Sequence, residues 1–327
     1  MVGREPGFHG ICNEIELKVC LLDNYLMFAS KSPAFRITSL EPIHWTDTWK
    51  WPSSAQKADG SSTKAMKNPE KYLLDIIDRH QPKRLKGQSA RIIRLESELQ
   101  SWAQDCFMGI HESGSHARGT ATSVSSNVKL LLLLSNTCHR NAGGIRSCYE
   151  SLYGYLIERY RDVKKHRVSL RLRLNGMDID ITPARMKLGE PDLHTLYQPE
   201  DGKILETSIL LHTDDAQAAA RAAETKLLKI WFDQHDIQWP AIYVDYLVPT
   251  KLLANVKPEK DSLALNFMHM IRQVAKRDFN PLLENFEDPA NNENLLSELM
   301  SDQDKRTAIK AAQQALMART IQDVIEA

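Results

Sequence analysis

The sequence predicts an α+β protein in which a mixed sheet with helices is followed by an all-α half. A run of five leucines at residues 130–134 is typical of a buried strand. Two runs of alternating apolar and polar residues at 167–185, with Asn175 and Gly176 between them, predict a β-hairpin. Helical patterns fill the sequence from residue 214 onward. Strands gathered before helices favour an α+β fold.

The first elements expected along the chain are two amphipathic helices. Residues 69–80, PEKYLLDIIDRH, carry apolar side chains at helical spacing, and Pro82 ends the pattern. Residues 89–110 repeat the pattern with Ser89 as a suitable N-cap. A Gly-Ser turn at Gly114 follows and leads into the leucine-rich strand, as GSHARGTATSVSSNVKLLLLLS.

After the leucine-rich strand, one more helix and a β-hairpin are expected before the helical half begins. Residues 144–160 predict a helix, and the hairpin follows it, with leucines on one face and arginines on the other. The most strongly helical segment, 214–235, is rich in alanine. Further helices are expected at 240–256, 262–277 and 304–327.

Composition limits the possible function classes. The chain has 327 residues with 42 basic and 42 acidic side chains, so it carries no overall field that would attract nucleic acid or an anionic membrane. The longest apolar run is too short to cross a bilayer. The start, MVGREPGFHG, lacks the basic and then apolar pattern of a signal peptide, which predicts a cytoplasmic protein with no membrane contact.

The cysteines predict neither a disulfide framework nor a zinc site. They number five, form no CxxC pair, and favour reduced thiols: Cys12, Cys20, Cys106, Cys138 and Cys148. The stretch HESGSH does not have the HExxH spacing that places two histidines on one helix face, and Gly114 breaks a helix there.

Three regions are expected. Residues 1–85 form an N-terminal extension, partly irregular, in which Trp45, Trp49 and Trp51 either anchor the segment or form a small binding face. Residues 86–200 form the sheet domain, and residues 201–327 form the helical domain.

Five stretches in this order resemble a known superfamily. They are GSHARGTATSVSSNVKLL, VSLRLRLNGMDIDITPAR, LHTLY (193–197), ETSILLH (206–212) and KLLKIWFDQHDIQWPAIYVDYLV (226–248). Together they resemble the nucleotidyltransferases founded on DNA polymerase beta, and more narrowly the bacterial branch related to oligoadenylate and cyclic-oligonucleotide synthases. The resemblance covers residues 89–250 and implies the nucleotidyltransferase-fold mixed sheet.

The resemblance implies transfer of a nucleotidyl group from a nucleoside triphosphate to a hydroxyl, with Mg²⁺ ions held by three aspartates. Two of these stand two residues apart on one strand, and the third stands on a neighbouring strand. Asp180 matches the third, and Asp178 precedes it on the same face. The catalytic pair is replaced by Asn127 and Lys129. The nucleotide-binding positions implied by the match are Gly114, Ser115, Arg118, Lys226, Lys229 and, near the base, Tyr243.

The replaced pair predicts an impaired metal site. Asparagine offers an oxygen without charge, and the ammonium of Lys129 offers only donors. Two like charges at ~4 Å cost ~1 kcal/mol in water and ~4 kcal/mol at an effective dielectric near 20, so magnesium affinity is expected to fall steeply. We expect the Lys129 ammonium to replace the metal as the counter-ion of Asp180.

Three functions remain open from the sequence. The first is a nucleotidyltransferase with a nucleotide or an RNA as acceptor. The second is a nucleotide-binding or scaffolding pseudoenzyme, which Asn127 and Lys129 favour. The third is an RNA-binding protein that uses the basic strand face of Arg167, Arg171 and Arg173, against which the balanced charge argues.

Overall fold

The computed structural model describes residues 68–82, 89–124, 127–174, 176–257 and 262–326. The chain divides into two units, Met1–Lys64 and Ala65–Ala327, and every described residue belongs to the second. The predictions for Trp45, Trp49 and Trp51 fall outside the described residues.

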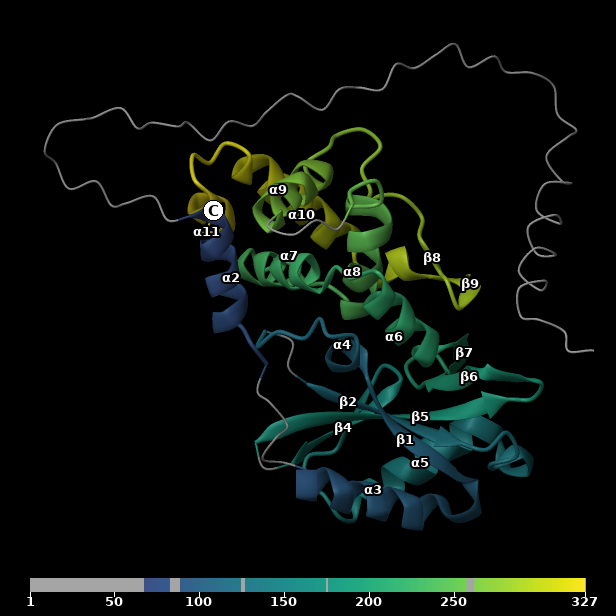
Figure 1. Cartoon of the computed structure of the whole chain (residues 1–327). Coiled ribbons are helices and arrows are strands. Elements are labelled where there is room, and N and C mark those ends of the chain that lie inside the picture. The colour runs from purple at the N-terminus through teal and green to yellow at the C-terminus, as the bar shows by residue number, and fades with distance from the viewer. Residues whose placement is uncertain (1–67, 83–88, 125–126, 175, 258–261, 327) are drawn as a thin grey trace, which may run out of the picture. The chain divides into compact units, whose positions relative to one another are not determined.

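Seven strands of the described residues form one mixed sheet (Figure 1). The order is β1-β2-β5-β4-β3, and the other end of β5 pairs with β6, which pairs with β7. Only the β2–β5 pair is parallel among these ladders. The strands are β1 Phe107–Ser113, β2 Val128–Leu134, β3 Lys164–His166, β4 Ser169–Leu174, β5 Met177–Lys187, β6 Glu190–Gln198 and β7 Lys203–Thr207.

The leucine run forms the central strand β2, which is buried on both faces. Leu130, Leu132 and Leu134 belong to the main core beside α3 and α5, whereas Leu131 and Leu133 belong to a smaller cluster on the opposite face. This is why the run does not alternate with polar residues. Lys129, the second residue of β2, is exposed and is the exception to this burial.

The described helices fall into two groups (Figure 1). Helices α3 and α5 lie against one face of the sheet, and a helical group that includes α2, α7, α9 and α10 lies on the other side. The helices are α2 Pro69–Arg79, α3 Ser89–Ala103, α4 Gly114–Ala117, α5 Gly144–Ile157, α6 Ile209–Ala218, α7 Ala222–Gln234, α8 Ala241–Leu247, α9 Leu263–Val274, α10 Asp302–Ala315 and α11 Ile321–Glu326. None of the helices in the described ranges combines the length and the apolar composition needed to cross a membrane.

The predicted hairpin is confirmed. Strands β4 and β5 pair antiparallel up to Leu174 opposite Met177, which leaves a two-residue connection between them. Gly176 in that connection has a φ of +82°, the left-handed conformation that such a turn requires.

Three helix predictions were wrong in extent. The helix expected at 89–110 ends at Ala103, because the residues after the 3₁₀ turn η2 (Gln104–Cys106) pair with β2 as strand β1 and cover its edge. The helix expected at 214–235 is two helices, since Ala220 takes a φ of +53° and the next residue, Arg221, turns inward to bond the carbonyl of Val256. The helix expected at 304–327 is likewise split, into α10 and α11.

The prediction that the late half contains helices only was also wrong. A two-stranded hairpin forms there, from β8 Glu287–Asp288 and β9 Asn291–Leu295. A π-helical turn, η4 Val248–Leu252, extends α8, and two more 3₁₀ turns are η3 Arg140–Ala142 and η5 Leu296–Leu299. The hairpin is short and polar, which explains why no alternating pattern indicated it.

The prediction of reduced thiols was wrong for one pair. Cys106, just before β1, and Cys138, just after β2, form a disulfide. The antiparallel pairing of Phe107 with Leu134 brings these two strand ends together. Cys148 is a free, buried cysteine, and burial raises the pKa of its thiol to about 11.

Candidate functional site

Four side chains form a row across the sheet at the end of β2. In register, Ser113 of β1 faces Lys129 of β2, Lys129 faces Asp180 of β5, and Asp180 faces Arg171 of β4. Residues paired in this way project from the same face of a sheet. The ladder alone therefore places the replaced metal position, Lys129, beside the remaining carboxylate.

The prediction that Lys129 is the counter-ion of Asp180 was wrong, because Arg171 holds this carboxylate. The Arg171 Nε donates to one carboxylate oxygen at 2.6 Å and Nη2 donates to the other at 2.9 Å. Asp180 is only 2% exposed, and the bond to it raises the pKa of Arg171. The planar guanidinium matches both oxygens at once, which a lysine ammonium cannot do.

The stem of Lys129 lies against the turn at Gly114. A Cβ at Gly114 would stand 2.7 Å from the Lys129 Cδ, and the glycine has a φ of +71°, so both space and backbone conformation require glycine there. Lys129 takes part in none of the ion pairs found among the described residues. Although the residue is exposed, the protein atoms around its ammonium remove part of its hydration and lower the pKa of Lys129, while Asp180 and Asp245 oppose that shift.

A second charge group, behind the turn, is fully internal. Asp245 of α8 accepts from the Arg118 Nε at 2.5 Å through one oxygen, and its other oxygen lies 2.5 Å from the Lys229 Nζ. Lys229 of α7 is 0% exposed and also donates to the Thr120 Oγ1 at 2.9 Å. Burial lowers the pKa of Lys229 to about 8, against the opposing effect of Asp245. These contacts tie segment 114–120 to the helical group.

The two charge groups act on each other. The pKa of Lys129 responds to Asp180 and Arg171 in the first group and to Arg118 and Asp245 in the second. Counting Lys229, the cluster holds four cationic side chains and two carboxylates, so it carries an excess of two positive charges. We call these six residues the charge cluster.

The remaining predicted site residues lie outside the charge cluster. Asp178 is half-buried, and its carboxylate lies 3.8 Å from the Arg173 Nε. Lys226 is half-buried, and burial lowers its pKa against the opposing effect of Asp78. Tyr243 is fully buried and donates to the carbonyl of Leu282 at 3.4 Å.

Asn127 directly precedes strand β2, and Ser115 follows Gly114 in α4. Asn127 is half-buried just before β2, two residues from Lys129. Ser115 is buried in the single turn of α4, and its carbonyl accepts from the amide of Thr120. These contacts fix the backbone of the segment that the resemblance assigns to phosphate binding.

Asp245 and the pairing role of Arg171 were missed by sequence reasoning. Asp245 stands alone among apolar residues in IYVDYLV, and a lone carboxylate in a buried helix indicates an internal ion pair. Arg171 was predicted to lie on an open basic face. On that face Arg171 and Arg173 each have an aspartate directly opposite them in the ladder.

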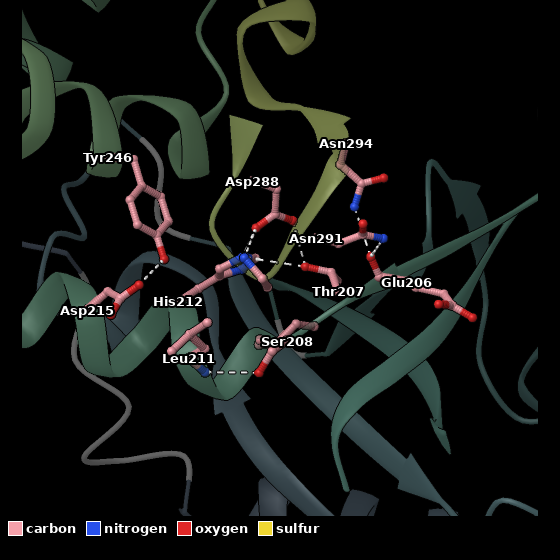
Figure 2. A network of polar contacts seen from close by, with 12 residues as sticks. Glu206, Thr207, Ser208, Leu211, His212, Asp215, Tyr246, Asp288, Asn291 and Asn294 are labelled. Carbon is pink, nitrogen blue, oxygen red and sulfur yellow. Dashed lines mark hydrogen bonds and ion pairs between the residues drawn. The ribbon is translucent and has the colours of Figure 1, made fainter. Parts of the chain in front are cut away.

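A polar network joins β7 and α6 to the late hairpin (Figure 2). The ring of His212 lies 2.7 Å from one oxygen of Asp288, and the hydroxyl of Thr207 donates to the other at 2.8 Å. The hydrogen bonds from His212, Thr207 and the amide of Ala290 hold the pKa of Asp288 below its usual range, although burial opposes them. Sequence patterns gave no signal for this network because its partners are 76 residues apart.

The network extends on both sides of this pair. The side chains of Asn291 and Asn294 both donate to the carbonyl of Glu206, at 3.0 and 2.8 Å. Tyr246, the neighbour of Asp245 in α8, donates to Asp215 at 2.8 Å (Figure 2). The sheet, helix α6 and the late hairpin are thereby connected beside the charge cluster.

Comparison with known proteins gives one sequence relative and several similar structures. No family model matches the chain. It is 29% identical over 160 residues to the cyclic AMP-AMP-AMP synthase of Escherichia coli (strain MS 115-1), an alignment that covers 42% of this chain and 48% of that relative. The chain thus spans about half the length of the curated relative that it matches.

The similar structures cover most of the chain. One is E. coli MS115-1 CdnC with ATP, at 20% identity and a TM-score of 0.57, covering 79% of this chain and 98% of that one. Bradyrhizobium diazoefficiens CdnG, a CD-NTase in complex with GTP, has 12% identity and a TM-score of 0.60 over 79% and 97%. The Cid1 poly(U) polymerase has 14% identity and a TM-score of 0.53 over 78% and 96%. At these identities the likeness concerns the fold.

Proposed function

This chain is related to the nucleotidyltransferase superfamily in sequence and has its fold, and we propose that it binds a nucleoside triphosphate without transferring it by the two-metal route. The observation that carries the proposal is the row Lys129, Asp180 and Arg171, where an ammonium and an internal ion pair stand at the position of the metal-binding carboxylates. Two of the solved relatives contain ATP or GTP, which supports a nucleotide as the ligand.

The residues at this position do not fit two magnesium ions. Magnesium is bound by oxygen donors, mainly carboxylates. Asn127 offers an uncharged oxygen, Lys129 offers only donors, and both oxygens of Asp180 are engaged by Arg171. In the described ranges, no three His, Cys, Asp or Glu side chains gather as a metal site would need. We therefore derive no catalytic step through a metal.

The turn to which our proposal assigns phosphate binding keeps its backbone geometry. Gly114 keeps the backbone conformation of the turn, and Arg118 and Lys229 hold segment 114–120 through Asp245. In our proposal Arg118 and Lys229 position the turn, since Asp245 already engages their charges. Lys129, exposed and beside Gly114, is the cation that meets the phosphates.

The proposal is tested by separating binding from transfer. The protein is incubated with labelled ATP or GTP and with Mg²⁺ or Mn²⁺, and bound nucleotide and released pyrophosphate are measured on the same sample. We expect saturable binding and no pyrophosphate above the protein-free rate. Pyrophosphate release that Asp180→Ala abolishes and Asp178→Ala leaves intact would show a working transferase. If the protein binds neither ATP nor GTP, the proposed ligand is refuted.

A further inference from the structure

We propose, resting on the proposed function, that this site takes the triphosphate as a metal-free anion, with Lys129 and Arg171 supplying the positive charge that a bound dication would otherwise supply. The ligand class is thus a free nucleoside triphosphate and not its magnesium complex. Magnesium then competes with the protein for the ligand and weakens binding.

The first support is the positive net charge of the site. The charge cluster has four cations against two carboxylates, so its net charge attracts a polyanion with no help from a metal. A dication on the phosphates cancels part of the ligand's negative charge and brings a like charge toward Lys129. Both effects disfavour the magnesium complex.

The second support is that donors remain unused. Lys129 is exposed and in none of the ion pairs of the described residues. The Nε and Nη2 groups of Arg171 donate to Asp180, and in the described part of the chain no hydrogen bond engages its Nη1 amino group. The Arg171 side chain is 29% exposed, so a phosphate oxygen can reach that group. Asp180 thereby orients the arginine for an anion.

The third support is the rigidity of the arrangement. The stem of Lys129 is packed against Gly114, and Asp180 fixes the guanidinium plane of Arg171 through two bonds. Side chains ordered before the ligand arrives lose less conformational entropy on binding. An anion near Lys129 would also oppose the lowering of its ammonium pKa, because a negative charge favours the protonated form.

The experiment is a calorimetric titration of the full chain with ATP, once in EDTA and once in excess Mg²⁺, at matched ionic strength. We expect binding in EDTA that is at least about tenfold weaker in Mg²⁺, a difference of about 1.4 kcal/mol. Inorganic tripolyphosphate is the second probe and should show the same dependence, because the phosphates carry the recognition.

Variants locate the effect. Lys129→Ala should lower the affinity in EDTA at least about tenfold, whereas Lys203→Ala, which removes an exposed lysine of β7 paired with Asp201, should not. The double change Asn127→Asp with Lys129→Asp should make Mg²⁺ strengthen binding.

The titration separates this inference from the proposed function. Binding by the unaltered chain only in Mg²⁺, or more tightly in Mg²⁺, overturns the metal-free ligand and leaves the proposed nucleotide ligand standing. Absence of binding in both solutions refutes both. The comparison uses the unaltered chain and does not depend on any variant folding.

Discussion

Replacing Asp245 with asparagine removes the carboxylate that Arg118 and Lys229 share inside the protein. The Asp245 and Lys229 side chains are 0% exposed and that of Arg118 is 5% exposed, so water cannot take over as partner. Removing one member of a buried ion pair costs about 3–5 kcal/mol. We expect Asp245→Asn to lower the free energy of unfolding by that amount at pH 7.

The two cations should not contribute equally to this loss. The pKa of Lys229 is about 8 while Asp245 is present and falls further without that carboxylate, so at pH 7 the variant can release this proton for no more than about 1.4 kcal/mol. Arg118 cannot release a proton and stays charged and buried. The second change Arg118→Met should therefore restore more stability to Asp245→Asn than Lys229→Met does.

The assay is urea unfolding of the wild type, of the three single variants Asp245→Asn, Arg118→Met and Lys229→Met, and of the two double variants. Unfolding is followed by circular dichroism and by tryptophan fluorescence. Coincident transitions are needed before free energies are compared. The reasoning is refuted if Asp245→Asn costs less than about 1 kcal/mol, the scale of an exposed ion pair. It is also refuted if the costs of Asp245→Asn and Arg118→Met simply add, because a shared buried contact must give a coupling energy.

Three more predictions concern the turn and two titrating groups. Gly114→Ala and Gly119→Ala both place alanine at a left-handed φ, +71° and +72°, at a backbone cost of about 1–2 kcal/mol each. Only the alanine at position 114 would contact Lys129, so in an equilibrium binding assay Gly114→Ala alone should lower the affinity for ATP. The pKa of Lys229 is about 8 in the folded protein and 10.5 in the unfolded chain, so between these pH values the unfolded chain binds more protons. In urea unfolding, the wild type should therefore gain stability relative to Lys229→Met as the pH rises from about 8 to about 10.5. Asp288→Asn should lower the free energy of unfolding by about 1.5–3 kcal/mol at pH 7. Because the pKa of Asp288 is lowered in the folded protein, its carboxylate stabilises the fold at pH values above the unfolded pKa of about 4. In a pH series of thermal unfolding, the cost of Asp288→Asn should therefore disappear as the pH falls below about 4.

The sequence was sufficient for the parts of the fold that local patterns determine. The hairpin at Gly176, the buried strand at 130–134 and the helix at 69–80 each follow from residues within a few positions of one another. The break after Ala218 does not, because it depends on Arg221 reaching the carbonyl of Val256. Strand β1 was likewise read as helix, since its pairing with β2 is a tertiary contact.

The site was predicted by position but not by partner. Lys129 and Asp180 were correctly expected to lie side by side, because the strand register brings them there. Which cation holds Asp180 depended on β4 lying on the other side of β5, with Arg171 directly opposite. Asp245 belongs to a different part of the chain, 127 residues from Arg118, and no local pattern specifies that contact.

The most direct measurement is a crystal of the full chain soaked with a non-hydrolysable triphosphate and Mn²⁺, followed by an anomalous difference map. Triphosphate density beside Lys129 and Arg171, without a manganese peak at the end of β2, is the predicted result. Manganese bound to Asp180, with Arg171 displaced from that carboxylate, would contradict the claim that protein cations have replaced the metals.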